Sequence, residues 1–253
     1  MRHRVLIGAL VVAGAMACGE VPTLDQGIAY ISPIILPAPA VAIGDTLRDS
    51  LGTVAPLRIE AYGRNDEKLP APQATFLPTI LPSTVSIDAN GILTASDSVS
   101  AVRTVLLVGR VGGKLQTTRA SLLVVPQPDS IERTSPEVRS APLPGLDTLR
   151  VSVTGVLAAT RVPVPGIIVR YRVTRVFGSG AASASTVLTM DGGTVSRPDS
   201  LVAVDTTDAS GAASRTLIVG PGVDSVVVFA HARSLRGVPL AGDSVRFVLR
   251  AAP

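Results

Sequence analysis

Short runs of residues in which apolar and polar side chains alternate restrict the fold of this chain more than any other feature. In one run, Leu57, Ile59 and Ala61 alternate with Arg58, Glu60 and Tyr62. A period of two points successive side chains to opposite sides of a β-strand, so that one side can enter a core while the other stays in water. Further strand-forming runs occur at 85–87, 92–94, 102–111, 118–125, 149–153, 167–173, 226–230 and 245–249. No amphipathic helical pattern appears after residue 17, so the chain is predicted to be all-β.

Turn residues separate these runs at regular intervals. Asn90-Gly91 lies between the runs 85–87 and 92–94, and Asn-Gly is the strongest short hairpin signal because both residues tolerate positive φ. The segments 112–114, 191–193 and 208–211 are also typical of turns, since they are rich in glycine or aspartate. Many short strands joined by such turns predict β-sandwiches.

The length of the chain, 253 residues, fits two domains of ordinary size. Five prolines lie between residues 126 and 145, and proline both removes ladder donors and stiffens the chain. We therefore predict sandwich domains over 28–126 and 146–253, joined by a Pro-rich linker over 127–145. The alternative is that the part of this stretch near Ile131 adds an edge strand to one of its neighbours.

The N-terminus has the pattern of a secretory signal. Arg2 and Arg4 precede an uninterrupted apolar run over 5–17, which is shorter than the roughly 20 residues that a membrane-spanning helix needs. Small residues end the run directly before Cys18, the single cysteine of the chain. No disulfide can form within the chain, and a lone cysteine in an exported protein calls for another role.

Residues 15–18, Ala-Met-Ala-Cys, resemble the lipobox of bacterial lipoproteins. The resemblance implies a cleaved signal peptide over 1–17, a lipid on Cys18 and a short tether over 18–27. Several acyl chains would anchor the protein stably in the membrane. Because Gly19 replaces the aspartate that retains enteric lipoproteins in the inner membrane, we expect the outer membrane of the cell envelope, if the cell has one. Lipoboxes usually have leucine where Ala15 stands, and ordinary cleavage after Ala17 is the alternative.

Both predicted domains resemble bacterial immunoglobulin-like families. Residues 45–125, centred on VSIDANGILTA at 85–95, resemble the group 2 domain. PGIIVRY at 165–171 and TTDASGAA at 206–213 resemble the group 1 domain of invasins and intimins. The resemblance implies an all-β fold of two immunoglobulin-like β-sandwich domains. The first domain departs by a Pro-rich insertion, 69–82, and the second lacks the outer-membrane barrel of true intimins, so invasion of host cells is not implied.

The sequence offers no residues for catalysis or for zinc. His231 is the one histidine outside the signal, and no G-x-S-x-G nucleophile turn is present. Zinc needs several His or Cys ligands. Calcium takes carboxylates, and Asp205 and Asp208 lie beside the Gly211 turn; Asx hydrogen bonds to the backbone are the alternative role for them. We expect no enzyme activity, no cofactor and no metal.

The charge of the chain is close to neutral. Lys and Arg number 23 and Asp and Glu 19, for a net charge of +4, and loss of Arg2 and Arg4 with the signal lowers this by two. A balance this even argues against nucleic acid as a partner. Four arginines near one another in sequence form a candidate partner-binding site for an anionic partner: Arg161, Arg170, Arg172 and Arg175. The alternative is a solvated face that protects a sheet edge from pairing.

These features predict a non-catalytic, membrane-anchored envelope lipoprotein that acts as a structural spacer or as an adhesion or interaction module. Its partner would be an envelope or extracellular macromolecule, either a protein or an anionic glycan. The alternative function is a carbohydrate- or peptidoglycan-binding lipoprotein. That function favours exposed aromatic platforms, and the chain has no Trp and three Tyr.

Overall fold

The computed structural model describes residues 27–70, 72–79, 82–111, 116–178, 186–188 and 201–252. Regular structure in these residues is β-strand, apart from a 3-10 turn at Pro82–Thr84. The predicted all-β class is confirmed. Within the same residues, no helix has the length and apolar character to cross a membrane. The signal, Cys18, most of the tether and the turns at 112–114 and 191–193 lie outside the described residues.

The first sandwich is built on a four-stranded sheet. Its strands, in spatial order, are β2 (Ala40–Ala42), β8 (Gln116–Val125), β7 (Arg103–Val111) and β4 (Ala74–Pro78). Two strand pairs complete it: β5 (Val85–Ile87) with β6 (Leu93–Ala95), and β1 (Tyr30–Ile31) with β3 (Ala61–Tyr62). The predicted hairpin at 85–95 is present, with Gly91 at φ 79°. Leu47, Leu93, Leu107 and Leu122 are fully buried in the core between these layers.

The second sandwich has two larger sheets. One sheet has the order β10 (Val138–Ala141), β18 (Val245–Ala251), β17 (Val223–Ala232), β13 (Ile168–Gly178) and β15 (Val202–Thr206). The other has the order β12 (Thr160–Pro163), β11 (Gly145–Leu157), β16 (Ala212–Val219) and β14 (Val187–Leu188), and β9 (Pro128–Arg133) also pairs with β11.

Tyr171 joins these two sheets through their shared core. Its side chain on β13 is fully buried, and its hydroxyl donates a hydrogen bond of 2.8 Å to the carbonyl of Ala213 on β16. Burial, together with the nearby charge of Asp205, raises the pKa of Tyr171 above its usual value, so the hydroxyl stays neutral. A buried tyrosine with a satisfied hydroxyl supplies both apolar contact area and a fixed register between the sheets.

The stretch over 127–145, predicted as a Pro-rich linker, contains two strands. Residues 128–133 form β9, in which Ile131 is buried opposite Val153 of β11. Residues 138–141 form β10, which pairs in parallel with β18. Prolines are excluded from central strands but are tolerated at the first residue of a strand and between strands, where Pro128 and Pro136 lie. The alternative of an added strand near Ile131 is the one that the structure adopts.

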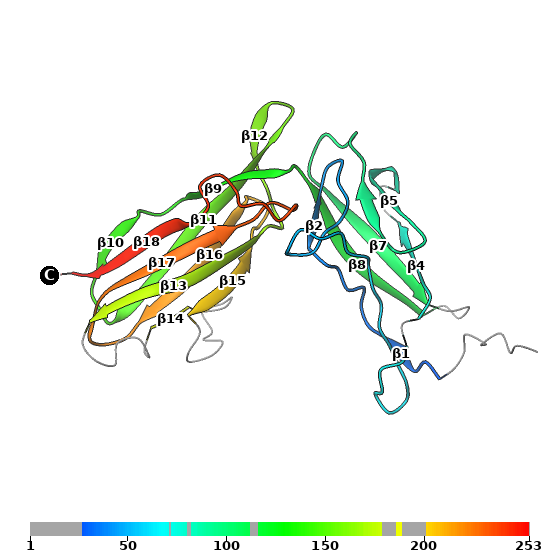
Figure 1. Ribbon diagram of the computed structural model, residues 1–253, viewed down its shortest axis with the longest axis horizontal. Coiled ribbons are helices and arrows are strands. Elements are labelled where there is room, and N and C mark those ends of the chain that lie inside the picture. Colours follow the sequence, from blue (N-terminus) through cyan, green and yellow to red (C-terminus); the bar gives the residue numbers. More distant parts are fainter. Residues whose placement is uncertain are drawn as a thin grey trace, which may run out of the picture.

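The second sandwich therefore follows the first almost directly. β8 ends at Val125 and β9 begins at Pro128, so two residues connect the modules. Figure 1 shows the modules arranged end to end, with the loop between β17 and β18 lying between them and the C-terminus at the far end of the second module.

Candidate functional site

The structure divides the four predicted arginines between two sheets. Arg170, Arg172 and Arg175 lie on β13, whereas Arg161 lies on β12 in the opposite sheet. Arg161 is used within the fold: its Nη1 donates to Ser130 Oγ at 2.5 Å and to Thr154 Oγ1 at 2.9 Å. It therefore ties β12 to β9 and β11 and does not extend the group on β13.

Arg170 and Arg172 project from the outer face of the five-stranded sheet. They are exposed, while the alternating Val169, Tyr171 and Val173 are buried in the core. Cross-strand pairing places Arg170 between Val204 and His231. It places Arg172 between Val202 and Phe229.

Arg175 joins the same face because of a β-bulge. Arg175 follows Arg172 by three positions, so in a regular strand its side chain would face the core, on the side opposite to Arg172. The register of β13 shifts between Val173 and Arg175, so that Arg175 pairs with Val227. Val227 lies between Val226 and Val228, which point into the core, and so it faces outward with its partner Arg175. Bulges re-aim side chains in this way, and no signal in the sequence indicates this one.

Strand β18 adds two arginines that the sequence interpretation missed. Arg246 pairs with Phe229, and Arg250 pairs with Ser225, which sets both on the outer side. The alternation of Val245, Phe247 and Leu249 with Arg246, Val248 and Arg250 was the available signal. We call the outer side of this sheet the arginine face, defined by Arg170, Arg172, Arg175, Arg246 and Arg250.

Among the described residues, few acidic side chains form ion pairs with the arginine face. Arg246 approaches Glu137 at 3.8 Å, and the same carboxylate lies 3.2 Å from Arg133. Within the part of the chain that the structure describes, Arg170, Arg172 and Arg175 form no ion pair. Their guanidinium groups are therefore available to a ligand.

Apolar side chains lie between and beside these arginines. Val202, Val204, Phe177 and Val138 are between 42% and 49% exposed on strands of this sheet. Phe229 stacks on His231 with ring centroids 6.1 Å apart. A surface that combines arginine with aromatic and aliphatic groups has the composition of a protein interface. The arginine face therefore differs in composition from a charged face that is only solvated by water.

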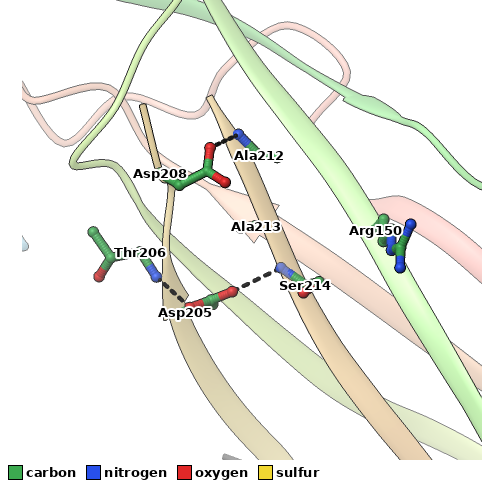
Figure 2. Close-up of a pocket in the computed structure, with 7 residues that line it drawn as sticks. All are labelled: Arg150, Asp205, Thr206, Asp208, Ala212, Ala213 and Ser214. Atoms are coloured by element: carbon green, nitrogen blue, oxygen red, sulfur yellow. Dashed lines mark hydrogen bonds between the residues drawn. The ribbon is translucent and has the colours of Figure 1, made fainter. Parts of the chain in front are cut away.

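Asp208 is used by the turn that it begins. Its Oδ1 accepts hydrogen bonds from the amides of Ser210 and Ala212 and from the Ser210 hydroxyl, as Figure 2 shows for Ala212. The hydrogen bonds from Ser210 and Ala212 hold the pKa of Asp208 below its usual value. This is the geometry of an Asx turn, the alternative that the sequence left open beside calcium.

Asp205 is likewise committed within the fold. Its two carboxylate oxygens accept from the amides of Thr206 at 2.9 Å and Ser214 at 2.7 Å (Figure 2), and Arg215 Nη1 lies 3.1 Å away. Among the described residues, no three His, Cys, Asp or Glu side chains gather in a way that could hold a metal ion. The open hollow that Asp205 and Asp208 line therefore lacks free carboxylate ligands.

His231 has a carboxylate and a hydroxyl beside it, but not in the arrangement of a nucleophilic triad. Asp243 Oδ1 lies 3.3 Å from Nδ1 of His231, and Ser244 Oγ lies 3.2 Å from the same nitrogen. A triad needs the acid and the nucleophile on opposite ring nitrogens. These three side chains consequently cannot relay a proton from serine through histidine.

The modules meet at a junction that buries apolar side chains from both. Ala40 on β2 and Val125 on β8 belong to the core cluster of the second sandwich, and Leu123 packs against it. Gly166 lies at the contact with φ 77°, and a side-chain carbon there would lie 2.9 Å from Cβ of Ala40. The backbone in this region has a close approach that only glycine permits.

An ion pair closes the other side of the junction. Asp45, buried after β2, accepts a hydrogen bond of 2.6 Å from Nε of Arg236 in the loop between β17 and β18. The carbonyl of Leu51 lies against Gly237 of the same loop. Contacts on two sides of a two-residue connection hold the modules in one orientation.

Acidification is expected to weaken this junction. Burial by itself raises the pKa of Asp45, but the hydrogen bonds from Arg236 and the Thr46 amide, with the charges of Arg236 and Arg48, outweigh it and lower the pKa below 3.8. Because the pKa of Asp45 is lower in the folded protein than in the unfolded one, the ionised carboxylate stabilises the fold when the pH is above the unfolded-state pKa. This stabilisation is lost as the pH falls through the folded-state pKa. Melting temperatures from roughly pH 5 to pH 2 should fall less steeply for Asp45→Asn than for the native chain. Parallel curves for the two proteins would contradict this role of Asp45.

Comparisons with known sequences identify no family: no family model matches the chain, and no curated protein matches it. Similar solved structures include the adhesin InvE of Yersinia pseudotuberculosis, with 16% identity over 88% of this chain and 58% of that chain and a TM-score of 0.34. The D0-D1 domain of Intimin has 14% identity over 88% and 96% of the two chains, with a TM-score of 0.26. The Escherichia coli adhesin FdeC has 14% identity over 88% and 64%, with a TM-score of 0.31. The chain thus spans little more than half of the InvE structure that it matches.

Proposed function

We propose that this chain is a non-catalytic, lipid-anchored envelope protein in which the first sandwich is a spacer and the second presents an interaction surface. The observation that carries the proposal is the tight junction between the modules, together with an arginine face on which Arg170, Arg172 and Arg175 form no ion pair among the described residues. Domains joined by a flexible linker move relative to one another by default. Here Asp45 with Arg236, and Ala40 with Gly166, oppose such motion from two sides.

The position of Cys18 supports the anchor. Cys18 precedes the first described strand, which begins at Tyr30, by twelve residues. A fully extended chain of that length spans at most about 40 Å. A lipid on Cys18 would therefore keep the first sandwich close to the membrane, while the second sandwich, at the other end of the junction, extends away from it.

The alternative of glycan binding has weaker support. Tyr30 and Tyr62 stack on each other with centroids 4.9 Å apart, so each ring covers one face of its neighbour. Their hydroxyls donate to Asp66 and Glu60. The stacking reduces the aromatic surface left for a sugar, whereas three arginines of the arginine face form no ion pair among the described residues.

The anchor is tested by Cys18→Ser. Native protein should partition into the detergent phase of a Triton X-114 extract, and mass spectrometry of its N-terminus should show an acylated cysteine. Cys18→Ser should remain in the aqueous phase, because it has no thiol to accept the lipid. Ala15→Leu, which restores the common lipobox residue, is the matched control and should behave as the native protein. Native protein with an unmodified Cys18 in the aqueous phase would overturn the proposal.

A further inference from the structure

We propose that the arginine face binds a protein partner through an extended acidic segment that presents carboxylates and apolar side chains on the same side. The inference rests on the proposed function and specifies the chemistry of the partner. Three observations carry it. Three arginines on one strand form no ion pair among the described residues, apolar side chains flank them, and backbone groups at the edge of β15 are already hydrogen-bonded.

The first step concerns charge and spacing. Side chains at alternate positions of a strand repeat about every 6.8 Å, and this is the separation expected between Arg170 and Arg172 along β13. An extended peptide has the same repeat, so its alternate carboxylates can match successive guanidinium groups. Arginine and carboxylate form paired, charge-assisted hydrogen bonds, which are stronger than neutral ones.

The second step concerns the apolar groups. Val204 and Val202 lie on one side of the arginines, and Phe229 lies on the other. A sulfated or carboxylated glycan would neutralise the charges and leave these side chains in water. A peptide that carries apolar residues would cover them, and burial of aliphatic and aromatic groups around arginine is what gives protein interfaces their affinity.

The third step excludes pairing at the sheet edge. β15 is an edge strand, and an extended segment could in principle add to it through backbone hydrogen bonds. The carbonyl of Val204 already accepts a hydrogen bond from Arg215, and the amide of Thr206 donates to Asp205. These backbone groups are engaged, so the partner has to be recognised through side chains on the face.

The fourth step excludes a second copy of the chain on the same face. Two arginine faces brought together would oppose Arg170, Arg172 and Arg175 to like charges, which costs affinity. Glu137 and Asp243 already contact Arg246 and His231. A face-to-face copy is therefore excluded, and the occupant supplies the carboxylates.

The test uses the full chain and labelled synthetic peptides, with binding followed by fluorescence anisotropy. A Glu-Val peptide that repeats Glu-Ser-Glu-Ser-Val-Ser, and so carries Glu and Val on one side of the extended chain, should bind. A Glu-Ser peptide with Ser in place of each Val should bind at least about tenfold more weakly, and one with Lys in place of each Glu should not bind. The double variant Arg170→Glu with Arg172→Glu should lose at least about tenfold in affinity for the first peptide.

The matched control is Arg110→Glu with Arg119→Glu, which makes the same charge change at two exposed strand arginines of the first sandwich. It should bind as the native chain does, and melting temperatures should show that both double variants are folded. The inference would be overturned if both double variants lost the same affinity, or if the Glu-Ser peptide bound as tightly as the Glu-Val peptide. Tighter binding of dextran sulfate or phosphatidylglycerol vesicles than of the Glu-Val peptide would also overturn it. So would a lack of binding by the Glu-Val peptide. None of these results alters the partitioning of Cys18→Ser, so the anchored spacer is tested separately.

Discussion

Replacing Asp205 by alanine is expected to lower the free energy of unfolding by about 3 to 5 kcal/mol, because it removes the carboxylate that lies beside a buried arginine. Arg215 on β16 is 5% exposed, and Asp205 on β15 is 16% exposed. The pair joins β15 and β16, which belong to opposite sheets of the second sandwich. The amide of Ser214 would lose its acceptor as well.

Urea unfolding followed by circular dichroism measures this change. Asp208→Ala is the control, because that carboxylate is solvent-exposed and serves a local turn, and it should cost only about 1 kcal/mol. Replacing both partners, Asp205→Leu with Arg215→Met, should recover much of the loss, since no buried charge then remains.

The same variant separates a structural role from a metal role. If Asp205 stabilises the fold through Arg215, Asp205→Ala should lose the same free energy of unfolding in calcium and in a chelator. A calcium ion held by Asp205 would instead raise the melting temperature of the native protein and leave that of Asp205→Ala unchanged. A loss below about 1 kcal/mol would contradict the buried ion pair. A loss that appears only in calcium would instead restore the metal hypothesis.

Replacing Gly166 by alanine is expected to cost about 2 to 5 kcal/mol and to loosen the junction. A left-handed φ costs a residue with a side chain about 1 to 2 kcal/mol, and crowding of a packed contact adds about 1 to 3 kcal/mol. Here the new methyl group would lie 2.9 Å from Ala40 Cβ and 3.0 Å from Leu123 Cδ1. Either the backbone of Gly166 or the first sandwich has to move.

Gly44→Ala is the matched control, since Gly44 has φ 70° but its nearest neighbour would lie at an ordinary 3.4 Å. It should cost about 1 to 2 kcal/mol and leave the arrangement of the modules unchanged. Small-angle scattering should detect a larger radius of gyration for Gly166→Ala than for Gly44→Ala. Equal stability and equal dimensions in the two variants would mean that the junction does not hold the modules together.

Local pattern was sufficient to predict β5, β6, β7, β8, β11, β13, β17 and β18, and the sides of most of their residues. The alternation around Tyr171 placed Val169 and Val173 in the core and Arg170 on the surface, and the structure agrees. Asn90-Gly91 identified a hairpin because the positive φ of its glycine is a property of that residue. Such features depend only on residues close together in the sequence, so they are fixed within a single strand or turn.

The remaining features depend on pairings between residues far apart in the chain, and only the tertiary structure decided them. The bulge that turns Arg175 outward is defined by its register with β17, and β9 and β10 become strands because β11 and β18 supply their partners. Asp45 and Arg236 are 191 residues apart, and nothing local to either indicates the other. The sequence by itself determined the strands in which apolar and polar residues alternate, and which of their sides are apolar. The tertiary structure decided which polar groups meet, because an ion pair or a junction requires two surfaces that folding alone brings into contact.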